Sequence, residues 1–435
     1  MSTVFAPELV TAALDAARPQ RLGRVAELVG LHVLVTGVDA AVGDLVEIQG
    51  TRPVLAEVAA GGPKGLICLP MTGTTGLRVG QQVRPTGAPL TVPVGTALLG
   101  RVLDGLGRPI DGGSSIDHLP RVSVQNAAPD AMTRTRITEQ LGLGVRALDS
   151  LVPCGRGQRI GIMAGSGVGK SSLLSMIARG TEAKVSVVAL IGERGREVRE
   201  FIEGDLGPEG LARSVVVVAT SDAPPVERLR AAFVATRIAE SFRDQGEDVV
   251  LMMDSLTRIA MAQREVGLAA GEPPATRGYP PSVFALLPQL LERAGASADG
   301  SITGLYTVLV EGDDLQDPVA DTARSILDGH VVLSRRLATA GHFPSIDVLE
   351  SVSRVSGSVT SPEQQSNAIQ LRRLLAAHRD VRELVEIGAY VAGADADADT
   401  ALARMPQINS FLRQSLHESA ALPDTWSALH ELVAS

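Results

Sequence analysis

Residues 158–179 read QRIGIMAGSGVGKSSLLSMIAR, and the fold class can be inferred from this segment. The apolar run 159–163 predicts a buried strand, residues 164–169 predict a glycine-rich loop, and the segment from Ser171 predicts a helix. Glycines let such a loop curl so that its N–H groups converge at a helix N-terminus, where the helix dipole favours anions. The order of strand, loop and helix therefore predicts a phosphate-binding loop in an α/β domain.

This loop offers specific groups to a bound nucleotide. We expect Lys170 to place its charge near the β- and γ-phosphates and Ser171 to ligate Mg²⁺, so that ATP and Mg²⁺ are the predicted ligands. The usual first glycine of GxxxxGK[ST] is Ala164 here, which is small enough for that position. The predicted nucleotide-binding residues of the loop are Ala164, Gly165, Ser166, Gly167, Val168, Gly169, Lys170, Ser171 and Ser172.

A second metal ligand is expected at the end of another strand. In GEDVVLMMDSLTR, Asp254 directly follows the apolar run 249–253. An aspartate at such a position commonly caps the next helix. Because a phosphate-binding loop lies upstream, we interpret Asp254 as the carboxylate that holds magnesium through water.

Hydrolysis also requires a group that orients or deprotonates the attacking water. The run VSVVALI ends in GERGRE, so Glu193 lies at a strand end, beside the loop-bearing strand if sequential strands are neighbours. A carboxylate flanked by arginines is equally typical of a surface ion pair. The residues alone leave both interpretations open.

Composition narrows the classes of function. The net charge is -9 and no long basic run is present, which disfavours direct nucleic-acid binding. Cys68 and Cys154 are isolated and suggest neither a disulfide framework nor a zinc site. The absence of a signal-peptide pattern and of a long apolar run predicts a cytoplasmic chain.

The 435 residues exceed what one core usually supports, so several domains are expected. Residues 1–20 carry apolar side chains at helical spacing and predict a short helical extension, which either docks a partner or frays. Residues 21–92 contain short β-rich runs typical of a small barrel. After a glycine- and proline-rich connector at 86–113, strands and helices alternate, so we assign 93–357 to an α/β domain with a parallel sheet. Residues 358–435 are predicted to be helical.

Five motifs together carry a family resemblance: AGSGVGKSS, IGERGREVREF, LMMDSLTR, EGDDLQDPVADTARSILDGHVVLSRRLA and FPSIDVLESVSR. The chain resembles the rotary-type hexameric ATPases, a family that includes the F-type ATP synthase β subunit, and most closely the flagellar and injectisome type III export ATPases. The likeness extends over nearly the whole chain. It implies an N-terminal β-barrel, a RecA-like P-loop core and a C-terminal helical domain, in a homohexameric ring with ATP sites at subunit interfaces.

The resemblance also implies roles for single residues. Glu193 matches the family's catalytic glutamate, and Arg354 matches an arginine finger that reaches a neighbouring subunit's site, although an interface salt bridge is the simpler role for that arginine. Phe343 stands where relatives usually carry a tyrosine beside the adenine, and it keeps the stacking face while losing the hydroxyl.

The function that the resemblance implies is an ATPase that energises type III protein export. It would release export chaperones and deliver substrates to a membrane export gate, as a cytoplasmic ring peripheral to the inner face of the membrane. Residues 21–30 and the connector favour the flagellum, with an injectisome as the alternative. The N-terminal helix suits a stator-like regulator.

Other classes of function have specific arguments against them. An ATP synthase catalytic subunit is disfavoured because the acidic helix-turn of those subunits is absent from the helical domain of this chain. An RNA translocase is disfavoured because residues 22–90 contain no Phe, Tyr or Trp for base stacking. A non-catalytic ring subunit is disfavoured by the joint presence of Lys170, Glu193, Asp254 and Arg354.

Overall fold

The computed structural model describes residues 21–434 apart from 311, 313 and 315, so the expected N-terminal helix lies outside the described residues. Contacts within the chain define two compact units. The first holds the described residues up to Leu90 together with Leu268–Glu272, and the second holds Thr91–Gly267 and the residues from Pro273 onward.

The first unit is a closed antiparallel barrel in the order β1-β2-β5-β4-β3-β6. Alternate side chains point inward, and β-branched residues such as Val33, Val35 and Ile48 form its core. Pairing of β1 with β6 closes the sheet and leaves no free edge. The predicted small β-barrel is thus confirmed. Its strands are β1 (Gly23–Val29), β2 (His32–Thr36), β3 (Asp44–Ile48), β4 (Val54–Gly62), β5 (Gly65–Pro70) and β6 (Gln82–Pro89).

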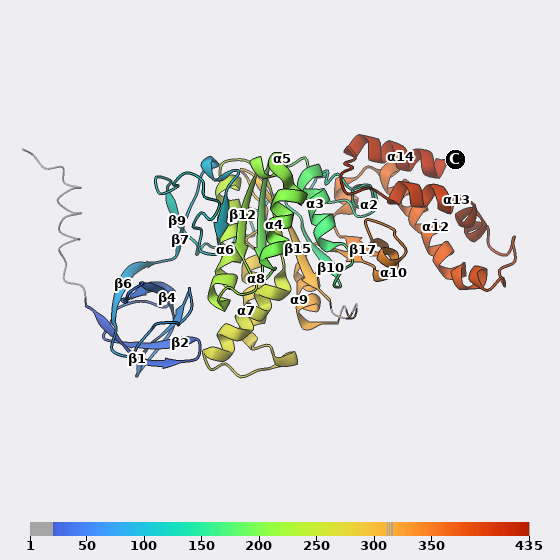
Figure 1. Ribbon diagram of the computed structural model, residues 1–435. Coiled ribbons are helices and arrows are strands. Elements are labelled where there is room, and N and C mark those ends of the chain that lie inside the picture. The colour runs from blue at the N-terminus through green and yellow to red at the C-terminus, as the bar shows by residue number, and fades with distance from the viewer. Residues whose placement is uncertain (1–20, 311, 313, 315, 435) are drawn as a thin grey trace, which may run out of the picture. The chain divides into compact units, whose positions relative to one another are not determined.

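The centre of the second unit is a mainly parallel sheet in the order β17-β16-β10-β15-β13-β11-β12-β8, with β14 paired to β15 (Figure 1). Strands β11 and β12 are buried along their whole length, as expected for a parallel sheet covered on both faces. The predicted α/β core is confirmed. Its strands are β8 (Val102–Asp104), β10 (Arg159–Ala164), β11 (Val185–Ile191), β12 (Ser214–Ala219), β13 (Asp248–Asp254), β14 (Gly295–Ala296), β15 (Ser301–Leu309), β16 (Gly329–Leu333) and β17 (Ile346–Ser353).

One detail of the sequence interpretation is wrong. Strand β11 is not beside the loop-bearing strand β10, because the later strands β15 and β13 lie between them. The connector contributes strands of its own. Its residues Val102–Asp104 form β8, which pairs with β12 at the sheet edge, and β7 (Thr91–Pro93) pairs with β9 (Arg121–Ser123). Strand order and edge pairing depend on long-range contacts that local patterns do not encode.

Helices flank this sheet, and α6 packs against β11, β12 and β13. An N-cap fixes the start of α9, where the Asp317 side chain accepts hydrogen bonds from the N–H groups of Val319 and Ala320. The flanking helices are α2 (Arg146–Leu151), α3 (Lys170–Gly180), α4 (Gly195–Glu200), α5 (Gly207–Ala212), α6 (Pro225–Arg243), α7 (Leu256–Ala269), α8 (Pro281–Leu291), α9 (Pro318–Ile326), α10 (Arg335–Thr339) and α11 (Ser356–Val359).

The C-terminal helices are α12 (Pro362–Glu386), α13 (Ala396–Leu412) and α14 (Leu422–Ala434). They gather beside α2, in red in Figure 1. Their residues Leu371, Phe411 and Trp426 belong to the same hydrophobic cluster as Leu148 of α2, so these helices and the sheet form one compact unit. Within the described residues, no helix combines the length and apolarity needed to span a membrane.

Candidate active site

The loop after β10 exposes backbone donors at the start of α3. Gly167 and Gly169 have φ values of 74° and 96°, a left-handed conformation that favours glycine. Helix α3 begins at Lys170 without a side-chain cap, so its first N–H groups remain available to an anion. Ala164 is fully buried at the end of β10, which accounts for a small residue at the first motif position.

The ammonium group of Lys170 lies between two carboxylates. Its Nζ is 2.9 Å from Oε1 of Glu193 and 2.5 Å from Oδ1 of Asp254. Burial by itself would lower the pKa of Lys170, but the charges of Asp254 and Glu193 outweigh it and raise the pKa above its ordinary value. The structure therefore brings these three predicted site residues together, although they come from separate strand ends.

Asp254 ends β13 and is only 3% exposed. Its Oδ1 also accepts a hydrogen bond of 2.7 Å from Oγ1 of Thr307, on the neighbouring strand β15. Burial raises the pKa of Asp254, Glu193 raises it further, and Lys170 opposes both. A carboxylate in this setting is stabilised by any cation that approaches it.

The residues present fit a magnesium ion. Asp254 supplies a carboxylate at the carboxyl end of β13, and Ser171 is exposed in the first turn of α3. Carboxylate and hydroxyl oxygens are the hard donors that Mg²⁺ prefers, usually with waters and phosphate oxygens completing its shell. Outside this pair, the described residues include no group of three or more His, Cys, Asp or Glu side chains placed to hold a metal.

Glu193 is positioned by the turn that follows β11. Gly192 has a φ of 75°, and a Cβ there would lie 2.8 Å from Cγ of Arg258, so the stem of Arg258 packs on this glycine. The carbonyl oxygen of Glu193 accepts a hydrogen bond from the N–H of Ser221. These contacts hold the Glu193 carboxylate at the same edge of the sheet as the loop.

Phe343 lies beside the glycine-rich loop, next to Gly169. A Cβ on Gly169 would be 3.6 Å from ring atoms of Phe343, and the phenylalanine is 46% exposed. Its carbonyl oxygen accepts a hydrogen bond from the N–H of Gln414 in the C-terminal region. The ring thus keeps a free surface next to the start of α3.

Sequence reasoning missed four residues that support the site. Ser345 donates a 2.5 Å hydrogen bond to the carbonyl oxygen of Val168, and Arg335 donates one of 3.2 Å to that of Ser166. Thr307 and Arg258 were missed as well. None of the four had a usable signal, because each contact joins segments that are distant in the sequence. Its Nε is buried with no hydrogen-bond partner among the described residues.

Arg354 is not part of this cluster. Strand β17 runs antiparallel to β16, with Ser353 opposite Gly329, and β16 runs parallel to β10. The last residues of β17 therefore lie near the first residues of β10, at the opposite end of that strand from the glycine-rich loop. There the guanidinium of Arg354 donates a hydrogen bond to the carbonyl oxygen of Arg324.

Two family models match the chain. Residues 144–353 match the ATP synthase alpha/beta family, nucleotide-binding domain, and residues 360–431 match the T3SS EscN ATPase C-terminal domain. The flagellum-specific ATP synthase of Bacillus subtilis is 50% identical over 420 residues, covering 96% of each chain. The type 3 secretion system ATPase of Xanthomonas euvesicatoria is 50% identical over 432 residues, covering 99% of this chain and 97% of its own.

Solved structures agree with these sequence matches. The assembled ATPase EscN from the type III secretion system of enteropathogenic E. coli superposes with a TM-score of 0.90 at 46% identity, over 94% of this chain and 100% of EscN. A second structure holds EscN with its central stalk EscO, at a TM-score of 0.88. Fold, motif order and near-full-length identity coincide, and the chain belongs to the family of flagellar and type III secretion ATPases.

Proposed function

We propose that this protein hydrolyses Mg²⁺-ATP to ADP and phosphate in order to energise type III protein export, and that it serves the flagellar apparatus. One observation carries the catalytic part of the proposal. An uncapped helix N-terminus, a lysine and two carboxylates from other strands converge at the carboxyl ends of the strands in a parallel sheet. Phosphate binding and hydrolysis by a P-loop enzyme require these groups.

Each residue has a role that follows from its position. The loop N–H groups and Lys170 hold the β- and γ-phosphates, and Lys170 leaves its two carboxylate partners to do so. Ser171 and Asp254 would hold Mg²⁺, which would neutralise charge on the phosphates. Glu193, released from Lys170, accepts a proton from or orients the attacking water. Phe343 stacks on the adenine.

Arg354 acts on the site of a neighbouring subunit. Within one chain it lies at the sheet edge away from the glycine-rich loop, so it cannot reach its own bound phosphate. In a ring of identical subunits the same residue can enter the next subunit's site, where its charge stabilises the transferring phosphoryl group. The homohexameric ring is part of this proposal, and the assembled state of EscN supports an oligomer.

The choice between the two export systems rests on the N-terminal segment and the connector. Residues 21–30 and 86–113 favour a flagellar role, and relatives named flagellum-specific ATP synthase reach 50–52% identity. The 50% identity to the Xanthomonas protein and the EscN match favour an injectisome as the second candidate. Restoration of motility in a flagellar ATPase deletion strain by this chain, without restoration of injectisome secretion in a matched strain, would separate them.

One proposed partner is a stalk-like subunit. The end of α12 and the segment after it expose Leu384, Ile387 and Val391, which form an apolar tip. Such a tip suits a subunit comparable to EscO, the central stalk of EscN. Export chaperones with their substrates, a stator-like regulator at residues 1–20 and the membrane export gate complete the proposed set, with the ring at the cytoplasmic face of the membrane.

The first test is Mg²⁺-ATP hydrolysis across a range of protein concentrations, with Glu193→Gln and Arg354→Ala alongside. The proposal predicts specific activity that rises with concentration, is lost in both variants and is lost when EDTA removes the metal. A wild-type chain that stays inactive at every concentration would instead indicate a subunit that needs a partner or is not catalytic.

A further inference from the structure

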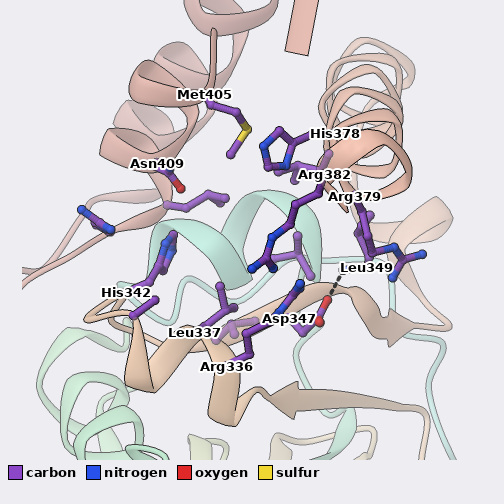
Figure 2. Close-up of a pocket in the computed structure, with 16 residues that line it drawn as sticks. Arg336, Leu337, His342, Asp347, Leu349, His378, Arg379, Arg382, Met405 and Asn409 are labelled. Carbon is purple, nitrogen blue, oxygen red and sulfur yellow. Dashed lines mark hydrogen bonds between the residues drawn. The ribbon is translucent and has the colours of Figure 1, made fainter. Parts of the chain in front are cut away.

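A cavity of about 330 Å³ opens where α10, the start of β17, α12 and α13 meet (Figure 2). None of the glycine-rich loop residues, Glu193 or Asp254 lines it, so it is distinct from the nucleotide site. Its volume lies within the usual size of small-molecule sites, roughly 300 to 1,000 Å³.

The walls of the cavity are mainly apolar. Figure 2 shows Met405 of α13 and His378 of α12 projecting toward one another, with Leu337 of α10 across the opening. Side chains from β17 and from the C-terminal helices complete this surface, among them Ile346, Leu349, Leu375 and Leu412. A ligand here would bury hydrocarbon or aromatic surface.

The rim is positively charged. Arg379 pairs with Glu350 at 2.7 Å and Arg382 pairs with Glu386 at 2.7 Å, while Arg336 and Arg413 have no carboxylate within ion-pair distance among the described residues. Two uncompensated guanidiniums therefore face one cavity.

Acidic groups inside the cavity do not offset this charge. Of the described residues lining it, Asp347 is the one carboxylate, and its Oδ1 already accepts hydrogen bonds from the N–H groups of Leu349 and Glu350. Burial and then the charge of Arg413 lower the pKa of His342. Burial, then Arg382 and Arg336, lower the pKa of His378. Both imidazoles are thus neutral near pH 7 and can donate or accept a hydrogen bond.

We propose that this cavity binds a small organic anion with an apolar body, whose acidic group pairs with Arg336 and Arg413 while its body fills the space between α12 and α13. A purely apolar ligand would leave both guanidiniums unpaired. A small inorganic anion would leave the apolar walls in contact with water. Arginine is well suited to the acidic group, because its planar fork matches carboxylates, sulfonates and phosphates.

Occupancy of the cavity is coupled to the nucleotide loop. The cavity wall at Arg336 and Leu337 adjoins Arg335, which bonds to the carbonyl oxygen of Ser166, and the segment that leads into β17 carries Ser345, which bonds to that of Val168. A ligand that orders this wall changes the affinity for nucleotide, and nucleotide changes the affinity for the ligand by the same factor.

The test uses the full chain and 8-anilinonaphthalene-1-sulfonate, a probe with a fused aromatic body and one sulfonate, followed by its fluorescence. We expect one saturable site. Arg336→Ala/Arg413→Ala removes the two charges and is expected to raise the dissociation constant about tenfold or more. Arg336→Lys/Arg413→Lys keeps the charges and is expected to retain most of the affinity.

Two further variants separate the cavity from general effects. Ala340→Trp fills the cavity without changing charge and is expected to abolish binding. Arg52→Ala/Arg78→Ala removes the same two charges from exposed positions in the barrel and is expected to leave binding unchanged. Because one cavity variant alters charge and the other alters volume, misfolding of either leaves the other informative.

The outcomes are decisive in both directions. The dissociation constant of the probe is also measured with increasing ADP. Loss of probe binding in the cavity variants alone, together with a change in this constant that reaches a plateau as ADP rises, supports the proposal. Binding that survives both cavity variants, or that is lost equally in the barrel control, overturns it because the probe then binds elsewhere. A dissociation constant that rises in proportion to ADP without limit also overturns it, since the probe then occupies the nucleotide site.

Discussion

Removal of the Lys170 charge should destabilise the nucleotide-free protein in a pH-dependent way. In Lys170→Ala, Asp254 and Glu193 lose the ammonium group that lies 2.5 Å and 2.9 Å from them. The Asp254 side chain is only 4% exposed and keeps a single hydrogen bond, from Thr307. Glu193 is more solvated, so the cost arises mainly at Asp254.

The size of the effect follows from two limits. Breaking a buried ion pair costs about 3 to 5 kcal/mol when the remaining charge stays buried. Protonation of Asp254 caps that cost, and neutralising an ordinary aspartate at pH 5.5 costs only about 2 kcal/mol. We therefore expect a loss of about 3 kcal/mol or more in unfolding free energy at pH 8 and about 2 kcal/mol or less at pH 5.5.

The stability of Lys170→Ala should fall as pH rises. Without Lys170, the folded-state pKa of Asp254 is raised further above its unfolded value by burial and by Glu193. Between those two pKa values the folded protein binds more protons than the unfolded chain, so stability falls as pH rises. The wild type should show this decline less steeply because Lys170 opposes it.

Urea unfolding at the two pH values, without nucleotide, measures the effect. Lys170→Ala/Asp254→Asn removes the buried charge as well and should recover stability to within about 1 kcal/mol of the wild type. Lys184→Ala removes a lysine that is 81% exposed and should change little. If Lys170→Ala unfolds at the wild-type midpoint at pH 8, or if Asp254→Asn gives no recovery, the reasoning about this cluster is wrong.

Three other predictions concern single residues. Glu193→Gln should lower kcat by about 10² to 10⁴ and leave the Kd for a fluorescent ATP analogue within a few-fold of the wild type. An equal loss of binding would argue against a role for Glu193 in activating the attacking water. Phe343→Ala should weaken ATP binding by about tenfold or less in the same assay, and an unchanged Kd would remove the stacking role. Arg101, through its hydrogen bonds, holds the pKa of Asp111 below its ordinary value, so this pair stabilises the protein above about pH 4 and less as pH falls. Asp111→Asn should therefore lower the urea midpoint by more at pH 7 than at pH 3, and a constant difference would contradict this.

The local parts of the site could be predicted because they are contiguous in the chain. The strand, loop and helix around Lys170 lie within 22 consecutive residues, so periodicity and glycine spacing suffice to place them. The barrel and the α/β core were predictable for the same reason, since each strand and turn carries its own local pattern.

The supporting contacts could not be predicted in this way. Thr307 bonds to Asp254 across 53 residues, and Ser345 bonds to Val168 across 177 residues. Thr307 meets Asp254 because the later strand β15 inserts between β10 and β13, whereas Ser345 meets Val168 because β16 and β17 add to the other side of β10. Local patterns specify neither arrangement. The insertion of β15 made the expected neighbourhood of β10 and β11 wrong, while the length of the Lys170 side chain still lets it reach Glu193.

The central claim is that each catalytic site combines the loop and Glu193 of one chain with Arg354 of the next. The most direct test mixes Glu193→Gln and Arg354→Ala proteins, each inactive alone, after subunits have exchanged. In an equimolar mixture about a quarter of the interfaces join an intact Glu193 to an intact Arg354. We predict recovery of Mg²⁺-ATP hydrolysis toward that fraction of wild-type activity. A mixture that stays as inactive as its components would contradict a shared site.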